Sequence, residues 1–160
     1  MDLNKAIKTR RSVRDFSSKK PDWRDIIEAI DSSRYAPAAS NIFTLKFILV
    51  DNKEKINRIA DYSQQNFISQ VQYAIIVCSE KKLLDNAFPE KSKEFSNQQS
   101  VAAIQNFLLK LTDLGLATCW IGAFIEKKIK EEFKIPDSVD IIAIFPIGYE
   151  KGKVKSKTKL

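Results

Sequence analysis

Residues 103–124 read AIQNFLLKLTDLGLATCWIGAF and carry the clearest structural pattern in the chain. Apolar residues recur at helical spacing from about 98 to 114, with Ile104, Leu108 and Leu111 on one face. Gly115 follows, at a position where helices commonly end in a left-handed residue. The sequence therefore predicts a long amphipathic helix over about 98–114, followed by a strand or strand-like loop over 118–124.

Other elements lie on both sides of this helix. Apolar runs predict strands over 46–51, 73–79 and 140–149. Further helices are predicted over 2–9, 23–34, 53–62 and 125–133. The run 73–79 is apolar throughout, as in a strand buried on both faces, and Pro146 indicates a bulge or an edge. Residues 81–99 are irregular and charged, and helices and strands do not alternate regularly, so we expect an α+β fold with one domain over 1–160.

Charge is concentrated at the two ends of the chain. The chain has 27 Lys and Arg against 20 Asp and Glu, a formal net charge of +7. Residues 1–20 hold seven basic and two acidic side chains, and residues 151–160 hold five lysines and no acid. Each end therefore carries +5, which leaves −3 for the residues between them. This distribution argues against the uniformly basic surface that coats nucleic acid.

The residue types that are missing exclude several kinds of chemistry. The chain has no histidine, which removes Ser-His-Asp and Cys-His hydrolases and His-ligated zinc, and we predict no metal site. Cys78 and Cys119 stand in apolar runs, so we interpret them as small buried hydrophobes in a reduced, cytoplasmic setting. The four glycines form neither the Rossmann nor the P-loop phosphate motif. We expect no signal peptide, and the longest apolar run, 141–147, is too short for a membrane span.

Three short segments are candidates for binding a ligand. Residues 10–14 (RRSVR) place three guanidinium groups and a hydroxyl together, a set that suits phosphate oxygens. The small residues of 37–41 (PAASN) would let a ligand approach the backbone, and Asn41 offers an acceptor and two donors. Gly122, after Trp120, could present backbone N–H groups to a planar ligand. Taken singly, each segment has a plainer interpretation: a solvated charge run, an interhelical loop and a core tryptophan.

The order of these segments resembles the nitroreductase family of flavin mononucleotide (FMN) oxidoreductases. RRSVRDF is similar to the Arg-Arg-Ser-x-Arg-x-Phe opening of that family, and APAASN to its Ala-Pro-Ser-x-x-Asn loop. QNFISQVQYAIIVC, the segment 103–124 and PIGY are similar to later parts of the family. The resemblance runs from residue 1 to about 157.

The resemblance implies a mostly antiparallel sheet wrapped by helices around a long central helix. It implies an intertwined homodimer with FMN sites at the interface, and no nucleic-acid or membrane partner. NADH or NADPH would be the electron donor, with hydride passing to flavin N5 and on to a small organic acceptor such as a nitroaromatic or a quinone (ping-pong). No protein residue would be catalytic, which agrees with the missing histidine.

The resemblance also implies which residues bind the cofactor. Arg10 and Ser12 would hold the FMN phosphate and ribityl chain, with Arg11 nearby, and Arg14 would face the pyrimidine edge of the flavin. The loop 37–41 would come from the partner subunit to cover the ring. The loop residues and the remaining cofactor-binding residues that it implies are Pro37, Ala38, Ala39, Ser40, Asn41, Asn66, Ile121, Gly122, Lys155 and Lys157. The last two would complete a phosphate clamp.

The chain also departs from the family pattern. Phe43-Thr44-Leu45 stands where the family often has Gln-Pro-Trp, and Ala38 stands in place of a serine. Gln99 stands where an acid is often found, and residues 81–99 replace a longer insertion of the larger members. Two other functions stay open. One is a flavin-binding or flavin-scavenging protein without turnover, and the other is a small basic nucleic-acid-binding protein, for which no motif is recognised.

Overall fold

The computed structural model describes residues 1–152, and the structural statements that follow concern this part of the chain. Its centre is an antiparallel sheet of four strands in the order β1-β2-β4-β3. The strands are β1 (Leu45–Val50), β2 (Tyr73–Ser79), β3 (Ala117–Thr118) and β4 (Asp140–Gly148). The antiparallel pairing confirms the predicted α+β class.

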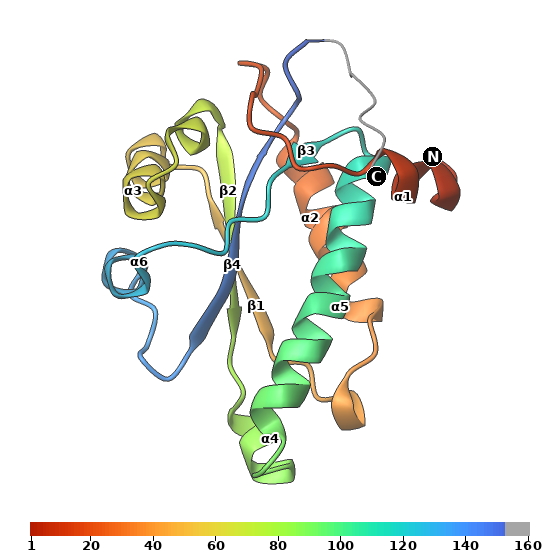
Figure 1. Ribbon diagram of the computed structural model, residues 1–160, viewed down its shortest axis with the longest axis vertical. Helices are drawn as coiled ribbons and strands as arrows, with labels where there is room; N and C mark the ends of the chain where they lie inside the picture. The colour runs from red at the N-terminus through yellow and green to blue at the C-terminus, as the bar shows by residue number, and fades with distance from the viewer. Residues whose placement is uncertain (153–160) are drawn as a thin grey trace.

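Helices cover both faces of this sheet (Figure 1). On one face lie α2 (Trp23–Ser32) and α5 (Ser92–Asp113), and on the other lie α3 (Lys53–Ser63) and α6 (Glu126–Phe133). The short helix α1 (Leu3–Thr9) packs beside the C-terminal end of α5, and α4 (Lys82–Ala87) lies at its beginning. Within residues 1–152, no helix is both long and apolar enough to cross a membrane.

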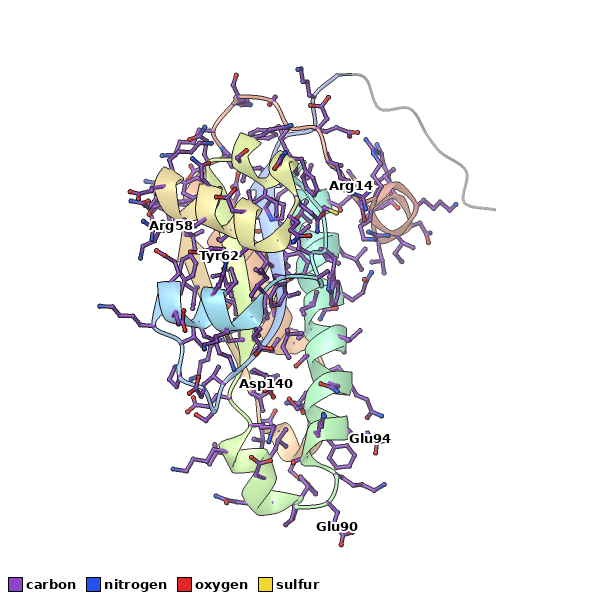
Figure 2. The ribbon with its side chains drawn as sticks, turned by 60° about the vertical axis from the view of Figure 1, so that its left-hand side comes forward. Arg14, Arg58, Tyr62, Glu90, Glu94 and Asp140 are labelled. Carbon is purple, nitrogen blue, oxygen red and sulfur yellow. The ribbon has the colours of Figure 1, made fainter. Side chains whose placement is uncertain are left out.

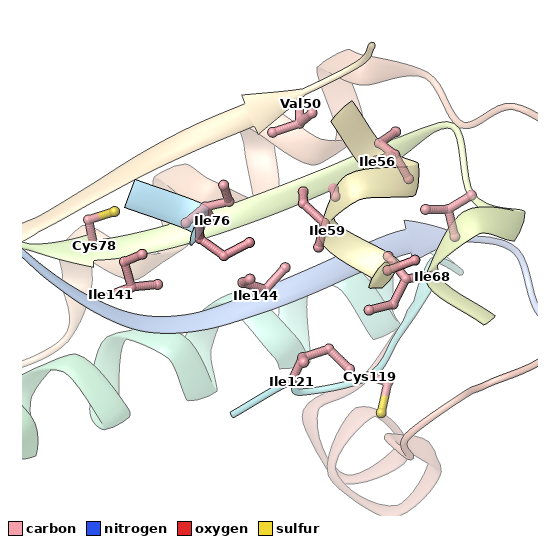
Figure 3. Packing of buried hydrophobic residues seen from close by; sticks show 14 of the residues in the cluster. Val50, Ile56, Ile59, Ile68, Ile76, Cys78, Cys119, Ile121, Ile141 and Ile144 are labelled. Carbon is pink, nitrogen blue, oxygen red and sulfur yellow. The ribbon is translucent and has the colours of Figure 1, made fainter. Parts of the chain in front are cut away.

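The strand β2 lies between the two helical layers and is buried along its whole length. Its alternate residues face opposite sides, because side chains of a strand alternate between the faces of a sheet. Ile76 and Cys78 pack toward α3 and α6, in the cluster that Figure 3 shows. Ile75 and Val77 pack with residues of α2 and α5. The prediction of a strand buried on both faces is confirmed, with antiparallel neighbours.

The central helix α5 begins earlier than the sequence pattern indicates. It starts at Ser92 and extends for 22 residues, so the prediction that residues 81–99 are irregular is wrong. The first turns bury polar residues at helical spacing: Ser92, Ser96, Gln99 and Ser100. A search for apolar periodicity misses this face because its members are small or amidic, although they lie on the same stripe as the apolar residues that follow.

The strand predicted over 118–124 is only partly present. β3 comprises two residues, and the chain rejoins the sheet in one isolated bridge, between Ile121 and Ile144. Pro146 lies inside β4, opposite Ala74, and the register shift falls at Val77/Cys78. Ile144 donates its N–H to the carbonyl of Ile121, on the β3 side of β4. The backbone N of Pro146, two residues further on, points to the same side, because alternate residues of a strand have the same orientation. There it faces the gap between β3 and the Ile121–Ile144 bridge. The missing N–H therefore interrupts no ladder.

Candidate functional site

A pocket of about 570 Å³ lies beside the C-terminal half of α5. Gln105, Leu108 and Thr112 line it from one face of the helix, because they are three and four residues apart. Its other walls come from the N-terminal segment, the chain around β3 and the end of β4: Met1, Thr9, Arg10, Arg11, Ser12, Val13, Gly115, Leu116, Ala117, Thr118, Trp120, Tyr149, Glu150 and Gly152. The volume falls within the range of small-molecule and cofactor sites.

Backbone hydrogen bonds hold the N-terminal segment at this pocket. They run from Val13 N to Thr118 O (2.9 Å), from Ser17 N to Tyr149 O (2.8 Å) and from Lys151 N to Asp15 O (3.0 Å). The two basic ends of the sequence are therefore adjacent up to residue 152. This adjacency is the arrangement that a shared anionic ligand would need.

A close approach between Phe16 and Gly148 locks the same segment in place. Phe16 is buried, and a Cβ built on Gly148 would lie 2.9 Å from its ring. Any larger residue at 148 would push the ring outward and with it the neighbouring arginines. Gly148, the glycine of the PIGY segment, thus leaves the space that the ring of Phe16 occupies.

The structure brings three of the four predicted residues of 10–14 to the pocket. Arg10 is the C-cap residue of α1, lines the pocket and makes no ion pair within residues 1–152. Arg11 forms an ion pair with Glu150, in which its Nη2 contacts Oε2 and its Nε donates to Oε1 at 3.3 Å. Ser12 is exposed and lines the pocket. Arg14 is exposed but does not line it, and Figure 2 places it in the same part of the molecule as α1.

The loop 37–41 lies elsewhere in this chain. It is attached to the N-terminal half of α5 through Gln99, and none of its residues lines the pocket. From Gln99 to the pocket-lining Gln105, Leu108 and Thr112 is about 9–20 Å along the helix at 1.5 Å per residue. Within one chain, the loop and the arginines are therefore separate features.

The other predicted cofactor-binding residues are scattered. Asn66 begins the 3₁₀ turn Asn66–Gln70, is exposed and does not line the pocket. Ile121 is buried beneath the sheet edge, and Gly122 is exposed just beyond the pocket wall that Trp120 forms. Lys155 and Lys157 lie outside the described residues.

Both cysteines are buried, as predicted. Burial raises the pKa of the Cys78 thiol to about 11, so it stays protonated at neutral pH. It faces the α3–α6 layer, away from the pocket (Figure 3). Neither cysteine lines the pocket, which fits the interpretation of both as core residues.

Sequence reasoning missed several residues of the pocket. Gln105, Leu108 and Thr112 could have been found, because their spacing places them on one face of the predicted helix. Glu150 could not, since its partner Arg11 lies 139 residues away in sequence and only folding brings them together. Trp120, interpreted from the sequence as a core residue, has two roles. It packs edge-to-face on Phe145 with ring centroids 5.4 Å apart, and it also lines the pocket.

Comparisons with known proteins show the family of this chain. The chain matches the model of the nitroreductase family over residues 7–91 and 70–149. It is 32% identical over 154 residues to a protein of Methanothermobacter thermautotrophicus, provisionally named NADH dehydrogenase/NAD(P)H nitroreductase. That match covers 93% of this chain and 78% of the relative. The chain therefore belongs to the nitroreductase family.

Solved structures have the same fold. A nitroreductase family protein from Clostridium novyi NT superposes with a TM-score of 0.86 at 29% identity, covering 94% of this chain and 86% of that one. The NADPH:FMN oxidoreductase of Vibrio harveyi, solved with NAD⁺, superposes with a TM-score of 0.86 over 99% of this chain and 73% of that one. At 18% identity the second likeness concerns the fold alone. Both confirm the predicted nitroreductase-like architecture.

Proposed function

We propose that this chain is an FMN-dependent NAD(P)H oxidoreductase that reduces a small organic acceptor, such as a nitroaromatic or a quinone. Membership of the nitroreductase family supports the class of reaction. The name of the M. thermautotrophicus relative supports the electron donor, and the V. harveyi enzyme supports FMN as the cofactor. The observation that carries the proposal is the pocket in which Arg10 and Ser12 meet an apolar wall.

The residues of the pocket fit FMN. A phosphate needs cationic and neutral donors, and Arg10 offers a guanidinium with no acidic partner in the described chain. Ser12 adds an exposed hydroxyl two residues further on. Leu108, Leu116 and Trp120 supply apolar surface of the kind that an isoalloxazine ring requires.

The protein contributes binding and orientation. Bound FMN would supply hydride transfer between NADH or NADPH and the acceptor, which would react one after the other (ping-pong). Arg10 and Ser12 hold the phosphate end, and the guanidinium of Arg11 is paired with Glu150. Glu150, the one acidic residue among the described pocket residues, is engaged by Arg11.

The proposal includes a homodimer in which the loop 37–41 covers the flavin of the partner subunit. The separation of this loop from the pocket of its own chain supports that role. Exposed large apolar residues also occur on α2, α5 and the segment between α2 and β1: Trp23, Ile27, Tyr35, Phe43 and Val101. A partner chain that covered them would remove apolar surface from water.

A spectrum of the purified protein tests the proposal. The protein is expected to be yellow, or to become so with added FMN, and its flavin absorbance should bleach with NADH or NADPH. A colourless protein that does not take up FMN would contradict the proposed cofactor. Flavin that stays oxidised with both donors would favour the flavin-binding alternative, and bleaching that reverses on adding a nitroaromatic or quinone would support the proposed acceptors.

A further inference from the structure

One buried side-chain amide holds the loop that follows η1 (Ser33–Tyr35). Gln99 on α5 is only 8% exposed. Its Oε1 accepts from the N–H of Ala39 at 3.2 Å, and its Nε2 donates to the carbonyl of Ile42 at 2.9 Å and to Oγ1 of Thr44 at 3.2 Å. A single amide thus forms hydrogen bonds with both the beginning and the end of the segment 39–44.

The segment that Gln99 holds is strained. Ser40 and Asn41 both have positive φ, at 48° and 58°, a region that costs energy for residues with a Cβ. Local hydrogen bonds are few: Asn41 N to Ala38 O (3.0 Å) and Ile42 N to Ala39 O (2.9 Å). Such a conformation persists when the surroundings determine it, and the amide of Gln99 is the side chain that does so here.

We propose that Gln99 is a positioning residue, which sets the shape of residues 39–44 so that this loop binds the FMN held in the partner's pocket. The inference rests on the proposed function, because it takes the loop to act across the dimer. Gln99 acts through the loop: its amide bonds the backbone of Ala39 and Ile42, and Asn41 between them is exposed.

Glutamine suits this position because the loop presents one donor and two acceptors to it. The amide has both kinds of group and satisfies all three partners. A carboxylate would still accept from Ala39 but would leave the carbonyl of Ile42 facing a negative oxygen. A thioether would leave every partner without a bond. Gln99→Glu therefore removes the donor role alone, whereas Gln99→Met removes both the donor and the acceptor role.

The first experiment measures hydrogen exchange in the full chain without FMN. In Gln99→Met, the N–H of Ala39 loses its acceptor and is expected to exchange at least about tenfold faster. The N–H of Ile42, which donates to Ala39 O, should also exchange faster because the loop is no longer held, whereas the amides of β2 stay unchanged. Gln99→Glu should retain part of the protection at Ala39. The matched control is Gln98→Met, at the exposed neighbouring position. Unchanged exchange at Ala39 and Ile42 in Gln99→Met would overturn the positioning role.

The second experiment asks on which subunit the loop acts. FMN affinity is expected to fall roughly tenfold to a hundredfold in Gln99→Met and to stay constant in Gln98→Met. A heterodimer of one Arg10→Ala chain and one Gln99→Met chain should then have one tight site, because one pocket receives both an intact Arg10 and an intact loop. Two weak sites would mean that the loop serves its own chain, and would overturn the proposal.

The proposed function and the role of Gln99 can fail separately. If the wild-type chain does not bind FMN, the proposed function fails and the role of Gln99 toward FMN fails with it. If the wild type and Gln99→Met bind FMN equally although loop protection is lost, only the inference about Gln99 fails. Steady-state kinetics add a check: Gln99→Met, supplemented with enough FMN to fill the site, should recover most of kcat if its defect is one of binding.

Discussion

The two halves of α5 stabilise their surroundings by different chemistry. Beside the C-terminal half lies the pocket, where Arg10 and the half-buried ion pair of Arg11 with Glu150 supply charge. The N-terminal half uses neutral hydrogen bonds in the interior, from Ser96 to Ser79 on β2 and from Gln99 to the loop. Charge near water suits recognition of an anion, whereas buried neutral bonds fix a backbone shape. The C-terminal half of α5 therefore borders the site for the ligand, and the N-terminal half fixes the shape of the loop.

Figure 2 shows Arg14 near the end of the molecule that carries the pocket, and Glu90 and Glu94 at the opposite end, around the start of α5. The opposite end also carries Lys81, Lys82, Lys91 and Lys93, so the charges there are mixed. The predictions below test whether the two halves of α5 are independent, beginning with the change that should affect both.

Replacing Phe107 should have the largest effect. Phe107 lies in the C-terminal half of α5, is fully buried and contacts two rings, Phe47 and Phe145, at centroid distances of 6.2 and 5.5 Å. Phe107→Ala leaves a cavity and is expected to lower the free energy of unfolding by about 3–5 kcal/mol. Urea unfolding measures this loss, with Gln98→Ala on the surface of the same helix as control. A loss below about 1 kcal/mol would mean that α5 is not the common support of both halves.

Removing the guanidinium of Arg10 should affect the pocket alone. Arg10→Ala is expected to weaken FMN binding about tenfold to a hundredfold, because charge-assisted hydrogen bonds are lost, and to leave loop exchange and stability unchanged. Fluorescence titration with FMN measures the affinity. Lys127→Ala, on α6 across the sheet, removes the same charge far from the pocket. An equal loss of affinity in both variants would indicate a general effect of net charge in place of a contact.

Releasing Arg11 should have a smaller effect of the opposite sign. Glu150→Gln removes a carboxylate from the pocket wall and is expected to strengthen FMN binding roughly threefold to tenfold, since less negative charge opposes the phosphate. The cost in stability should stay below about 1 kcal/mol, because both side chains are partly exposed. Weaker binding in Glu150→Gln would show that the ion pair orients Arg11 for the ligand.

Much of the fold could be predicted because its signals are local. β2 and the middle of α5 show the periodicities of buried strands and amphipathic helices in the sequence itself. The first turns of α5 could not be predicted this way, since Ser92, Ser96 and Ser100 become buried through neighbours that the sequence does not place beside them. β3 was overestimated because the apolar residues after Thr118 pack into the core without continuing the ladder.

The candidate site could be predicted only in parts. The segment 10–14 has a composition that suggests anion binding, and the pocket contains Arg10, Arg11 and Ser12. The arrangement of the loop 37–41 has no such signal, because it depends on Gln99 about sixty residues away in sequence. Whether Asn66, Gly122 and the tail lysines contact FMN stays a prediction, which a structure with FMN would test.

Acid should weaken both ends of α5, with the smallest effect of the series. Near the N-terminal end of α5, hydrogen bonding to Ser92 and then to Lys81 lowers the pKa of Asp85 below its ordinary value. At the pocket end, the N-terminal ammonium and then Lys110 lower the pKa of Asp113 in the same way. A carboxyl group with a lower pKa in the folded state stabilises the protein above its unfolded pKa, near pH 4, and loses this contribution as pH falls through the folded value.

Asp85→Asn and Asp113→Asn should therefore each reduce the difference in urea midpoint between pH 7 and pH 3. The control is Asp61→Asn, which removes an exposed carboxylate that makes no ion pair in the described part of the chain. If the halves of α5 are independent, the double variant should lose the sum of the two single effects, because distant sites add. Only Asp113→Asn should alter FMN binding, since the Met1 ammonium that it pairs with borders the pocket. An effect of Asp85→Asn on FMN affinity would show that the two halves are coupled through the helix.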